Sequence, residues 1–573
     1  MDRALVLVLT LGWLVMSGPV DGYSGVHYTR RGDINLGGLV PLHNYDEAGQ
    51  RCGSLRTLSA LKRVEALVYA VERLNANASL LPGIQLGFEI YDTCYSDAVT
   101  LRHCLDFVPS QRPGDNCSAG SALRSPRGRP SSCPPIVGVV GPQRSGSSVQ
   151  AALLLGLYRI PQVSYLASSD ELSNTYRYPY FLRTVGPDSF QVAAIADLLD
   201  RFGWRYVSFV NSDDAYGKSA QQAFRRQAQE RDLCVAIVRT VSLYADDRDF
   251  DELVGELLAL QEKSRAVVVV LFVQLEMARD IFAAASRARA WHHFVWIGSD
   301  GWGNYGYDAV DGYANVTLGA FTTSPLSSRL EEFDDYFHSL DTSNSANPWL
   351  LEFLEKYADC RSNASEARAA GRPSCDEPGL VRRMDDGKAS HETLVLDSVY
   401  TFAHALESLR RDLCPSQAQG LCANMTEIDG DALLEHLLST TFTSPANGWI
   451  SFTEEGDMYG RYAINYLQRN ETLGTAGFRR VGEWRQSLDD EPSLTIDSGL
   501  PWYLWDGASL DPDTGVPRSV CSDPCRPGER TNRIPDNPCC WTCTACEPSE
   551  IVAYNGTECL SCIDVDEGRF AWP

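Results

Sequence analysis

The chain has 573 residues, enough for about four units of ~150 residues each. With 44% hydrophobic, 10% aromatic and 22% charged residues it can form large cores, which excludes disorder or a low-complexity fibre as the main state. The formal net charge of −25 argues against nucleic acid or an anionic lipid surface as the principal partner.

The first 22 residues have the pattern of a secretory signal peptide. A charged start is followed by an apolar run over residues 4–16 and then by small and turn residues. No later apolar run approaches the ~20 residues of a membrane helix, so we expect no membrane span in the chain as given. Seven glycosylation sequons agree with an extracellular location, at Asn77, Asn116, Asn315, Asn363, Asn424, Asn470 and Asn555.

The 18 cysteines are unevenly distributed and are expected to form disulfides in that compartment. Ten are widely spaced between Cys52 and Cys422, and eight are crowded between Cys521 and Cys562. The crowded part is too short to bury a core and is expected to be held by disulfides, with zinc as the alternative for its Cys-x-x-Cys pairs. Residues 110–135 are rich in Pro, Gly and Ser and predict a surface loop, whose Cys117 and Cys133 form either a local bridge or a bond to a second chain.

Buried β-branched runs alternate with amphipathic segments before this crowded part. The runs, predicted as strands, are 135–141, 206–210 and 266–273. The segments predicted as helices are 58–75, 189–202, 219–231, 249–260, 276–289 and 391–409. This alternation over ~450 residues predicts an α/β fold, divided into two lobes because one doubly wound domain rarely exceeds ~250 residues. Ligands of such sheets bind at the carboxyl ends of the strands, here in a cleft between two facing lobes.

Four loops that follow predicted strands carry side chains suited to a free α-amino acid. They are residues 138–148, 165–169, 211–217 and 297–302. The first two are rich in hydroxyls and backbone N–H groups that suit a carboxylate, and the others add carboxylates and an aromatic ring that suit an ammonium group.

Several motifs together resemble the ectodomain of metabotropic glutamate receptors, family C of the G-protein-coupled receptors. They are Asp33–His43, Arg63–Ala66, Phe181–Arg183, Ile297–Trp302, Asn347–Trp349 and Cys539–Cys543, and the resemblance covers residues 30–565 in unbroken order. It implies a bilobed Venus-flytrap module of the periplasmic-binding-protein-like type I, with two parallel-sheet lobes, followed by a cysteine-rich neck. The expected domains are the signal peptide 1–22, the flytrap 30–505 (first lobe about 30–203 and 323–450, second lobe about 204–322 and 451–505) and the cysteine-rich domain 515–573, incomplete at its C-terminus.

The resemblance also implies which residues contact the ligand. The family serine that holds the ligand carboxylate matches Ser145, and a family threonine becomes Ser168, which keeps the hydroxyl. The acidic and aromatic residues around the ammonium match Asp188, Tyr216 and Asp300. In this scheme Ser145 and Ser168 belong to the first lobe, and Tyr216 and Asp300 belong to the second.

The far end of the ligand site departs from the family pattern. Arg63 matches the basic residue that faces the glutamate side chain, but its lysine partner falls on His391. A further basic position falls on Tyr305, and an aromatic neighbour becomes Ser59. We therefore expect an amino-acid receptor whose preference for glutamate is weakened or replaced, in which acidic ligands bind better when His391 is protonated. A solvent-facing or capping histidine is the alternative for His391.

The resemblance assigns disulfides as well. The implied pairs are Cys52–Cys94, Cys360–Cys375, Cys414–Cys422, Cys234–Cys539, Cys521–Cys540, Cys525–Cys543 and Cys546–Cys559. Cys117 matches the interchain cysteine of the family, and Cys104 and Cys133 are additional and are candidates for a bridge with each other. Cys562 has no partner, which suggests a fragment or a truncated gene product.

The implied mechanism is binding of an L-amino acid in the cleft, closure of the lobes, and transmission through the neck to a membrane domain that the chain lacks. The expected partners are the amino acid, a second copy through the first lobe and Cys117, and a G protein through that membrane domain; no cofactor, metal or nucleic acid is expected. The chain is then placed at the extracellular face of the plasma membrane, or secreted if it is complete. The alternatives are a soluble amino-acid-binding decoy, a secreted hydrolase, for which no nucleophile elbow or His-Glu-x-x-His motif is present, and a peptide-binding flytrap of the guanylate-cyclase type.

Overall fold

The computed structural model describes residues 26–46, 48, 50–77, 79–108, 135–385, 391–469, 476–486, 492–503, 510–511, 513–535 and 537–561. They form two compact units: unit 1 comprises the described parts of 1–165, 330–387 and 398–437, and unit 2 those of 166–329, 388–397 and 438–573. The predicted signal peptide, most of the predicted loop 110–135 with Cys117 and Cys133, two sequons (Asn116 and Asn470) and Cys562 lie outside the described residues.

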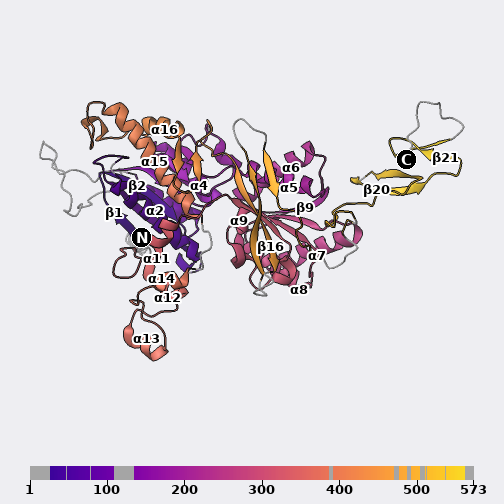
Figure 1. Ribbon diagram of the computed structural model, residues 1–573, viewed down its shortest axis with the longest axis horizontal. Coiled ribbons are helices and arrows are strands. Elements are labelled where there is room, and N and C mark those ends of the chain that lie inside the picture. Colours follow the sequence, from indigo (N-terminus) through magenta and orange to yellow (C-terminus); the bar gives the residue numbers. More distant parts are fainter. Residues whose placement is uncertain are drawn as a thin grey trace, which may run out of the picture. The chain divides into compact units, whose positions relative to one another are not determined.

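Unit 1 is built on a mainly parallel six-stranded sheet in the order β1-β5-β2-β6-β7-β8, whose last strand, β8 (Phe181–Arg183), falls in the residue range of unit 2. Strands β5, β2, β6 and β7 are parallel, and the edge strand β1 runs against its neighbour. Helices α3 and α4 pack on one face of the sheet, in a core that contains Leu39, Val139 and Leu155. Helix α15 packs closely on Gly138 of β6, since a Cβ added to this glycine would lie 2.2 Å from the ring of Phe402. The indigo ribbons in Figure 1, which include β1, β2 and α2, belong to this unit.

The strands of unit 1 are β1 (His27–Arg30), β2 (Ile34–Val40), β3 (His43–Asp46), β4 (Arg51–Leu55), β5 (Leu86–Asp92), β6 (Ile136–Val140) and β7 (Gln162–Ser164). Its helices are α2 (Leu58–Ala76), α3 (Asp97–Asp106), α4 (Ser145–Leu157), α11 (Glu331–His338), α12 (Leu350–Tyr357), α13 (Ala364–Ala370), α14 (Leu380–Met384), the short η4 (Ala423–Met425), and most of α15 (Glu392–Leu413) and α16 (Gly430–Leu438).

Unit 2 contains an eight-stranded sheet in the order β10-β9-β11-β12-β13-β16-β17-β18. The first five strands are parallel and the last three are antiparallel. Successive residues of β11 enter different cores: Val269 and Leu271 pack with α7 and α8, whereas Val268 and Val270 pack with α5 and α6. A strand covered on both faces has to be apolar at every position, which explains the continuous run in the sequence.

The strands of unit 2 are β8 (Phe181–Arg183), β9 (Tyr206–Ser212), β10 (Cys234–Val241), β11 (Val268–Phe272), β12 (Val295–Gly298), β13 (Phe321–Pro325), β14 (Phe442–Ser444), β15 (Gly448–Ile450), β16 (Arg461–Arg469), β17 (Ala476–Arg485) and β18 (Ser493–Ile496). Its helical segments are η2 (Asp170–Ser173), α5 (Asp188–Arg201), α6 (Ala215–Glu230), α7 (Asp247–Lys263), α8 (Leu275–Arg287), α9 (Asp300–Gly303), η3 (Gly306–Ala309) and α10 (Ala314–Thr317).

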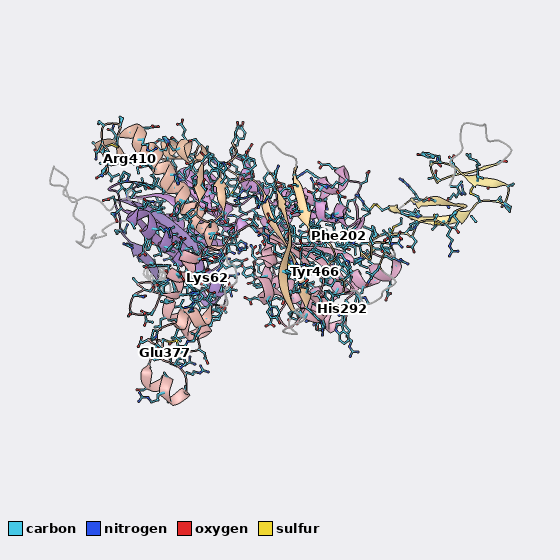
Figure 2. The ribbon with its side chains drawn as sticks, in the orientation of Figure 1. Lys62, Phe202, His292, Glu377, Arg410 and Tyr466 are labelled. Carbon is cyan, nitrogen blue, oxygen red and sulfur yellow. A yellow bond between two sulfur atoms is a disulfide. The ribbon has the colours of Figure 1, made fainter. Side chains whose placement is uncertain are left out.

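An aromatic cluster closes the core of unit 2 where α5 ends. The Phe202 ring lies 4.8 Å from Trp204 and 5.3 Å from Trp502, centroid to centroid, and Tyr466 lies 4.7 Å from Phe321. Phe202 and Tyr466 are labelled in Figure 2. The rings meet edge-on or tilted, an arrangement that adds to the stabilisation from burial.

The neck consists of two small hairpins held by disulfides. Its strands are β19 (Glu529–Ile534), β20 (Asn537–Ala545), β21 (Glu550–Val552) and β22 (Cys559–Ser561). The structure contains the disulfides Cys521–Cys540, Cys525–Cys543 and Cys546–Cys559 in the neck, Cys234–Cys539 between β10 and the neck, and Cys52–Cys94, Cys360–Cys375 and Cys414–Cys422 in unit 1. Every neck cysteine in the described residues is therefore bonded to sulfur, which leaves no thiolate for the zinc alternative.

Ser519 fastens the chain before the neck to the sheet of unit 2. It is fully buried, and its hydroxyl donates to the Tyr206 carbonyl at 2.6 Å and accepts from the amide of Val268 at 3.3 Å. Its own carbonyl accepts from the amide of Tyr206 at 3.1 Å. These contacts attach the neck at the start of β9 and β11, beside the covalent bond from Cys234 to Cys539.

We expect Ser519→Ala to lower the free energy of unfolding by about 1–3 kcal/mol, because it leaves buried backbone groups of β9 and β11 without a partner. Ser522→Ala is the control, since the Ser522 hydroxyl bonds to Trp541 at a half-buried place that water can reach. The measurement is urea unfolding followed by tryptophan fluorescence. Equal losses in the two variants would contradict the anchoring role of Ser519.

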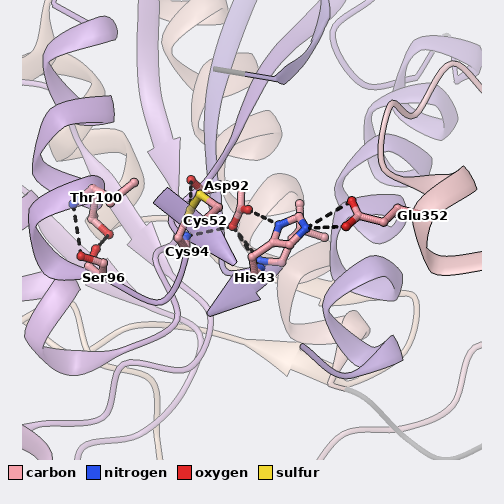
Figure 3. Close-up of a disulfide and its surroundings, with 9 residues drawn as sticks. His43, Cys52, Asp92, Cys94, Ser96, Thr100 and Glu352 are labelled. Carbon is pink, nitrogen blue, oxygen red and sulfur yellow. Dashed lines mark hydrogen bonds and ion pairs between the residues drawn. A yellow bond between two sulfur atoms is a disulfide. The ribbon is translucent and has the colours of Figure 1, made fainter. Parts of the chain in front are cut away.

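A buried histidine connects the β3–β4 hairpin of unit 1 to α12, beside the Cys52–Cys94 disulfide (Figure 3). Nδ1 of His43 lies 2.5 Å from Asp92 Oδ2, and Nε2 lies 3.2 Å from Glu352 Oε2. Burial disfavours the imidazolium, but the hydrogen bond and charge of Asp92, together with Glu352, outweigh it and raise the pKa of His43. The Asp92 carboxylate also accepts the backbone amide of Cys94 at 2.9 Å, so this network holds the hairpin in place.

The structure confirms the predicted α/β class, with parallel sheets in two units and a disulfide-held module after them. One expectation about cysteines was wrong: Cys104 is a free thiol, so it does not bridge Cys133. Its side chain is fully buried and packs with Phe107 and Tyr91 on the inward face of α3. The five sequon asparagines in the described residues are all exposed.

Candidate functional site

Four of the predicted ligand residues fall within the residues of unit 2, and two of them directly follow parallel strands of its sheet. Tyr216 is in the first turn of α6, directly after β9, and Asp300 begins α9, directly after β12. Asp188 begins α5, and Ser168 lies two residues before η2. The division into units groups Ser168 and Asp188 with Tyr216 and Asp300, whereas the expected boundaries placed residues 166–203 in the first lobe; those lobe boundaries stay a prediction.

Tyr216 and Asp300 form a buried hydrogen-bonded pair. The phenol donates to Asp300 Oδ1 at 2.5 Å and accepts the amide of Gly301 at 3.0 Å. The Gln191 side chain, with its amide oriented to satisfy both ends, donates to the same carboxylate at 3.0 Å and accepts from Thr323. Burial raises the pKa of Asp300 to about 6, against the opposing effect of these hydrogen bonds. Burial and the charge of Asp300 also raise the pKa of Tyr216, which keeps the phenol protonated.

Asp188 is the unusual member of the cluster. Its carboxylate is fully buried, and neither oxygen has a hydrogen bond within the described residues. Burial, then the charges of Asp170 and Asp300, raise its pKa well above the usual value, and the hydroxyl of Ser168 and the guanidinium of Arg183 only partly offset this. The Ser168 hydroxyl is likewise buried and makes no hydrogen bond of ordinary geometry in the described structure, although it is near enough to Asp188 to lower the pKa of that carboxyl group.

Buried polar groups in folded proteins are almost always paired, so an unpaired carboxylate beside an unpaired hydroxyl needs an explanation. Two buried carboxylates create a strongly negative site, and a cation that enters it gains two ion pairs while the protein loses a repulsion. An ammonium group with three donors matches the open acceptors of Asp188, Ser168 and Asp300. The arrangement therefore suits an amine ligand.

Two further predicted residues lie in unit 1. Ser145 is the first residue of α4 and is buried, so it lies at the helix N-terminus, where the helix dipole favours a negative group. Arg63, on α2, is also buried and donates from Nη1 to Gln143 Oε1 at 2.7 Å. Gln143, which the sequence analysis did not single out, thus connects Arg63 to the loop that leads into α4.

The positions at which the sequence departs from the family pattern are placed as follows. His391 is buried, has a positive φ of 59° and precedes α15. Tyr305 is buried in the core formed with α7 and α8, and Ser59, on α2, is half-buried. The described contacts do not join His391 to the Asp188 cluster, so its role toward acidic ligands stays a prediction.

The raised pKa values predict that affinity for a ligand with an ammonium group falls in acid. Below about pH 6 the carboxyl group of Asp300 becomes neutral and no longer attracts an ammonium group, so we expect up to about tenfold weaker binding per pH unit. The raised pKa of Asp188 acts in the same direction. Titrations of a ligand with a neutral side chain at pH 7.5, 6.5 and 5.5 measure this effect apart from His391, which acts in the opposite direction on acidic ligands. Constant affinity over this range would show that neither carboxyl group takes part.

Comparison with known proteins agrees with the fold. Residues 62–470 match the family described as "Receptor family ligand binding region", and residues 516–566 match the "Nine Cysteines Domain of family 3 GPCR". The chain therefore belongs to the ligand-binding extracellular regions of family 3 (family C) G-protein-coupled receptors, a family of two-lobed, non-enzymatic binding proteins with a cysteine-rich domain. Within the described residues, none of the helices is long and apolar enough to cross a bilayer.

Curated relatives of the chain include proteins named as metabotropic glutamate receptors. The chain is 34% identical over 553 residues to "Metabotropic glutamate receptor 6" of Oryctolagus cuniculus, and the matched region covers 95% of this chain and 62% of that protein. It is also 34% identical over 557 residues to the protein of the same name from Mus musculus, with 96% and 62% covered. The chain thus spans less than two thirds of the length of these relatives.

Proposed function

We propose that the chain binds an L-amino acid between its two lobes and is the ligand-sensing part of a receptor related to metabotropic glutamate receptors. The observation that carries the proposal is the buried, unpaired carboxylate of Asp188 beside Ser168 and the Tyr216–Asp300 pair. An α-ammonium group fits these acceptors, and Ser145 at the start of α4 supplies a hydroxyl and helix N–H groups for the α-carboxylate.

Calorimetric titration of the mature ectodomain with the twenty common L-amino acids tests this function. We expect at least one to bind with an affinity in the micromolar range and with a negative heat-capacity change from closure. Absence of binding by all twenty would overturn the proposal.

Side-chain specificity in this proposal depends on Arg63 and its surroundings. Arg63 retains a guanidinium for an acidic side chain, but His391, Tyr305 and Ser59 replace the other family positions. Losing a charged hydrogen-bond donor in a closed site costs about 2–3 kcal/mol, about two decades of affinity. We therefore expect glutamate to bind this chain more weakly than it binds receptors of the family, or a different amino acid to bind better than glutamate. Low-micromolar glutamate binding that no other amino acid rivals would contradict this.

Signalling in this proposal follows from closure. A ligand shifts the lobes only by the difference between its affinities for the closed and open states, and ~5.5 kcal/mol would change the closed fraction from about 1% to about 99%. The Cys234–Cys539 bond and the Ser519 contacts then carry the movement of the sheet to the neck. The membrane domain and the G protein that receive the movement are part of the proposal only.

We also propose that two copies associate through unit 1. Helices α3 and α4 pack together and expose several large apolar side chains: Leu101, Leu105, Leu153, Leu157 and Tyr158. Such exposed patches mark interaction surfaces, and Cys117, outside the described residues, supplies the candidate interchain disulfide. Non-reducing electrophoresis of Cys117→Ser tests the disulfide: we expect loss of the covalent dimer, and an unchanged covalent dimer would remove Cys117 from this role. Sedimentation of Leu157→Glu tests the apolar surface, and we expect weaker association of the two copies.

A further inference from the structure

Arg183 is the most completely buried cation of unit 2, and it contacts the loop that carries Ser168. It ends β8 and has no solvent exposure. Its Nη1 donates to two backbone carbonyls, that of Ala167 at 3.1 Å and that of Ser169 at 2.9 Å. One guanidinium nitrogen therefore holds the residues on both sides of Ser168, while the Ser168 side chain is left for other contacts.

The other side of the guanidinium is fixed by a second segment. Nε donates to Asp457 Oδ1 at 2.6 Å, and Nη2 donates to the Ser173 hydroxyl at 2.6 Å. The Ser173 hydroxyl in turn donates to Asp457 Oδ2 at 2.6 Å. The planar fork of an arginine can make these bonds at once, whereas a lysine ammonium has no matching geometry.

The rest of the Ser168 loop, residues 166–170, is fastened in the same way. The Ser168 carbonyl accepts the amide of Asp188 at 2.6 Å, the Ser169 hydroxyl donates to the Ala215 carbonyl at 3.2 Å, and the Asp170 amide donates to Ser219 at 2.8 Å. The loop is thus braced against α5 and α6, the helices that begin with Asp188 and carry Tyr216. The Ser168 hydroxyl is the polar group of this loop that makes no hydrogen bond of ordinary geometry in the described structure.

We propose that Arg183 is a positioning residue for ligand binding: it fixes the carbonyls on either side of Ser168 and so holds the Ser168 hydroxyl beside Asp188 for the ammonium group of the ligand. Arg183 does not contact the ligand in this arrangement. The inference rests on the proposed amino-acid function and deepens it by assigning the part that keeps the site in shape before the ligand arrives.

A second effect supports the role. Asp188 is faced by Asp170 and Asp300, which oppose its ionisation, and by Arg183, whose charge lowers its pKa. Removal of the Arg183 charge therefore leaves less Asp188 ionised near neutral pH, and the acid loss of ligand affinity moves to higher pH. A residue that only stabilises the fold would not shift this profile.

The test is a double-mutant cycle in the mature ectodomain, titrated with each of the twenty common L-amino acids. We expect Arg183→Met to weaken binding about 30-fold alone but less than about threefold in a Ser168→Ala background, because coupled residues are non-additive. Arg183→Lys retains the charge and tests the role if Arg183→Met does not fold. We expect this variant to keep most of the thermal stability and still to lose about tenfold in ligand affinity. Arg231→Met is the matched control, since Arg231 makes ion pairs with Asp197 and Asp200 in the same unit without contacting this loop.

Hydrogen exchange separates failure of this inference from failure of the proposed function. We expect the amides of residues 168–170 to exchange at least about tenfold faster in Arg183→Lys and Arg183→Met than in the wild type or in Arg231→Met. Unchanged exchange, or additive affinity losses in the cycle, would overturn the positioning role. A wild type that binds none of the twenty amino acids would instead overturn the proposed function, before any variant is compared.

Discussion

Asp188→Asn is expected to move ligand affinity and the stability of the ligand-free protein in opposite directions. Amino-acid binding weakens by about 100-fold, because an ammonium group loses a buried ion pair worth about 3 kcal/mol. The ligand-free protein becomes more stable at pH 7.4 by about 1–2 kcal/mol, because a buried carboxylate without hydrogen bonds no longer has to be ionised. Calorimetry measures the first effect and thermal unfolding the second.

The stability gain should depend on pH with a defined sign. The pKa of Asp188 is raised in the folded state, so its neutral form stabilises the folded protein at low pH, and this contribution is lost as pH rises through the folded pKa. The advantage of Asp188→Asn therefore disappears toward about pH 4, where the wild-type group is protonated as well.

Asp397→Asn is the matched control for this experiment. Asp397 is as buried as Asp188 and its pKa is also raised by burial, to about 6, but its oxygens accept bonds from Ser444 at 2.5 Å and Asn447 at 2.6 Å. An amide cannot accept both bonds, so this variant is expected to lose stability and to keep its ligand affinity. If both variants lose stability, the unpaired state of Asp188 is contradicted; if Asp188→Asn keeps its affinity, the ammonium site is contradicted.

Gly298→Ala is expected to destabilise unit 2 by about 3 kcal/mol and to weaken ligand binding. Gly298 ends β12, and a Cβ there would lie 2.1 Å from Cζ2 of Trp302. Trp302 is fully buried, its ring nitrogen donates to the Leu271 carbonyl at 3.3 Å, and it shares α9 with Asp300. The turn that presents Asp300 would have to move to make room.

Gly255→Ala provides the comparison by urea unfolding. Gly255 is exposed in the middle of α7, with no atom within 4 Å of an added Cβ. Alanine there is expected to stabilise the protein by about 1 kcal/mol, since it is the better helix former. Similar effects from the two substitutions would show that the contact under Trp302 does not constrain the turn.

Much of the fold could be predicted from local patterns. The apolar stripe starting at Leu58 predicts a helix over 58–75, and α2 covers 58–76. The predicted helix over 219–231 begins earlier, because the Asp214 side chain accepts the amide of Gly217 and caps α6 at Ala215. That cap places Tyr216 in the first turn, where its ring meets Asp300.

The candidate site was predictable only in part. The resemblance implied roles for Ser168, Tyr216 and Asp300 because these positions match those of the family. It gave no role to Gln191 or Gln143, and it included Arg183 in a motif without assigning it a function. Each of these residues acts through a partner distant in sequence: Arg183 and Asp457 are 274 positions apart. Such pairs leave no local signal in a single sequence. Cys104 was considered for a bridge with Cys133 because both cysteines are additional to the family pattern, whereas its burial as a free thiol depends on the packing of α3 and could not be predicted from the sequence.

The central claim is that buried carboxylates hold the ammonium group of an amino acid. Its most direct test is calorimetric titration of the wild-type ectodomain with each amino acid that binds and with the matching acid that lacks the α-amino group, such as glutarate for glutamate. Because the ammonium ion pairs are worth about 3 kcal/mol, we predict that the des-amino acids bind at least about 100-fold more weakly. Equal affinities within a pair would contradict the account.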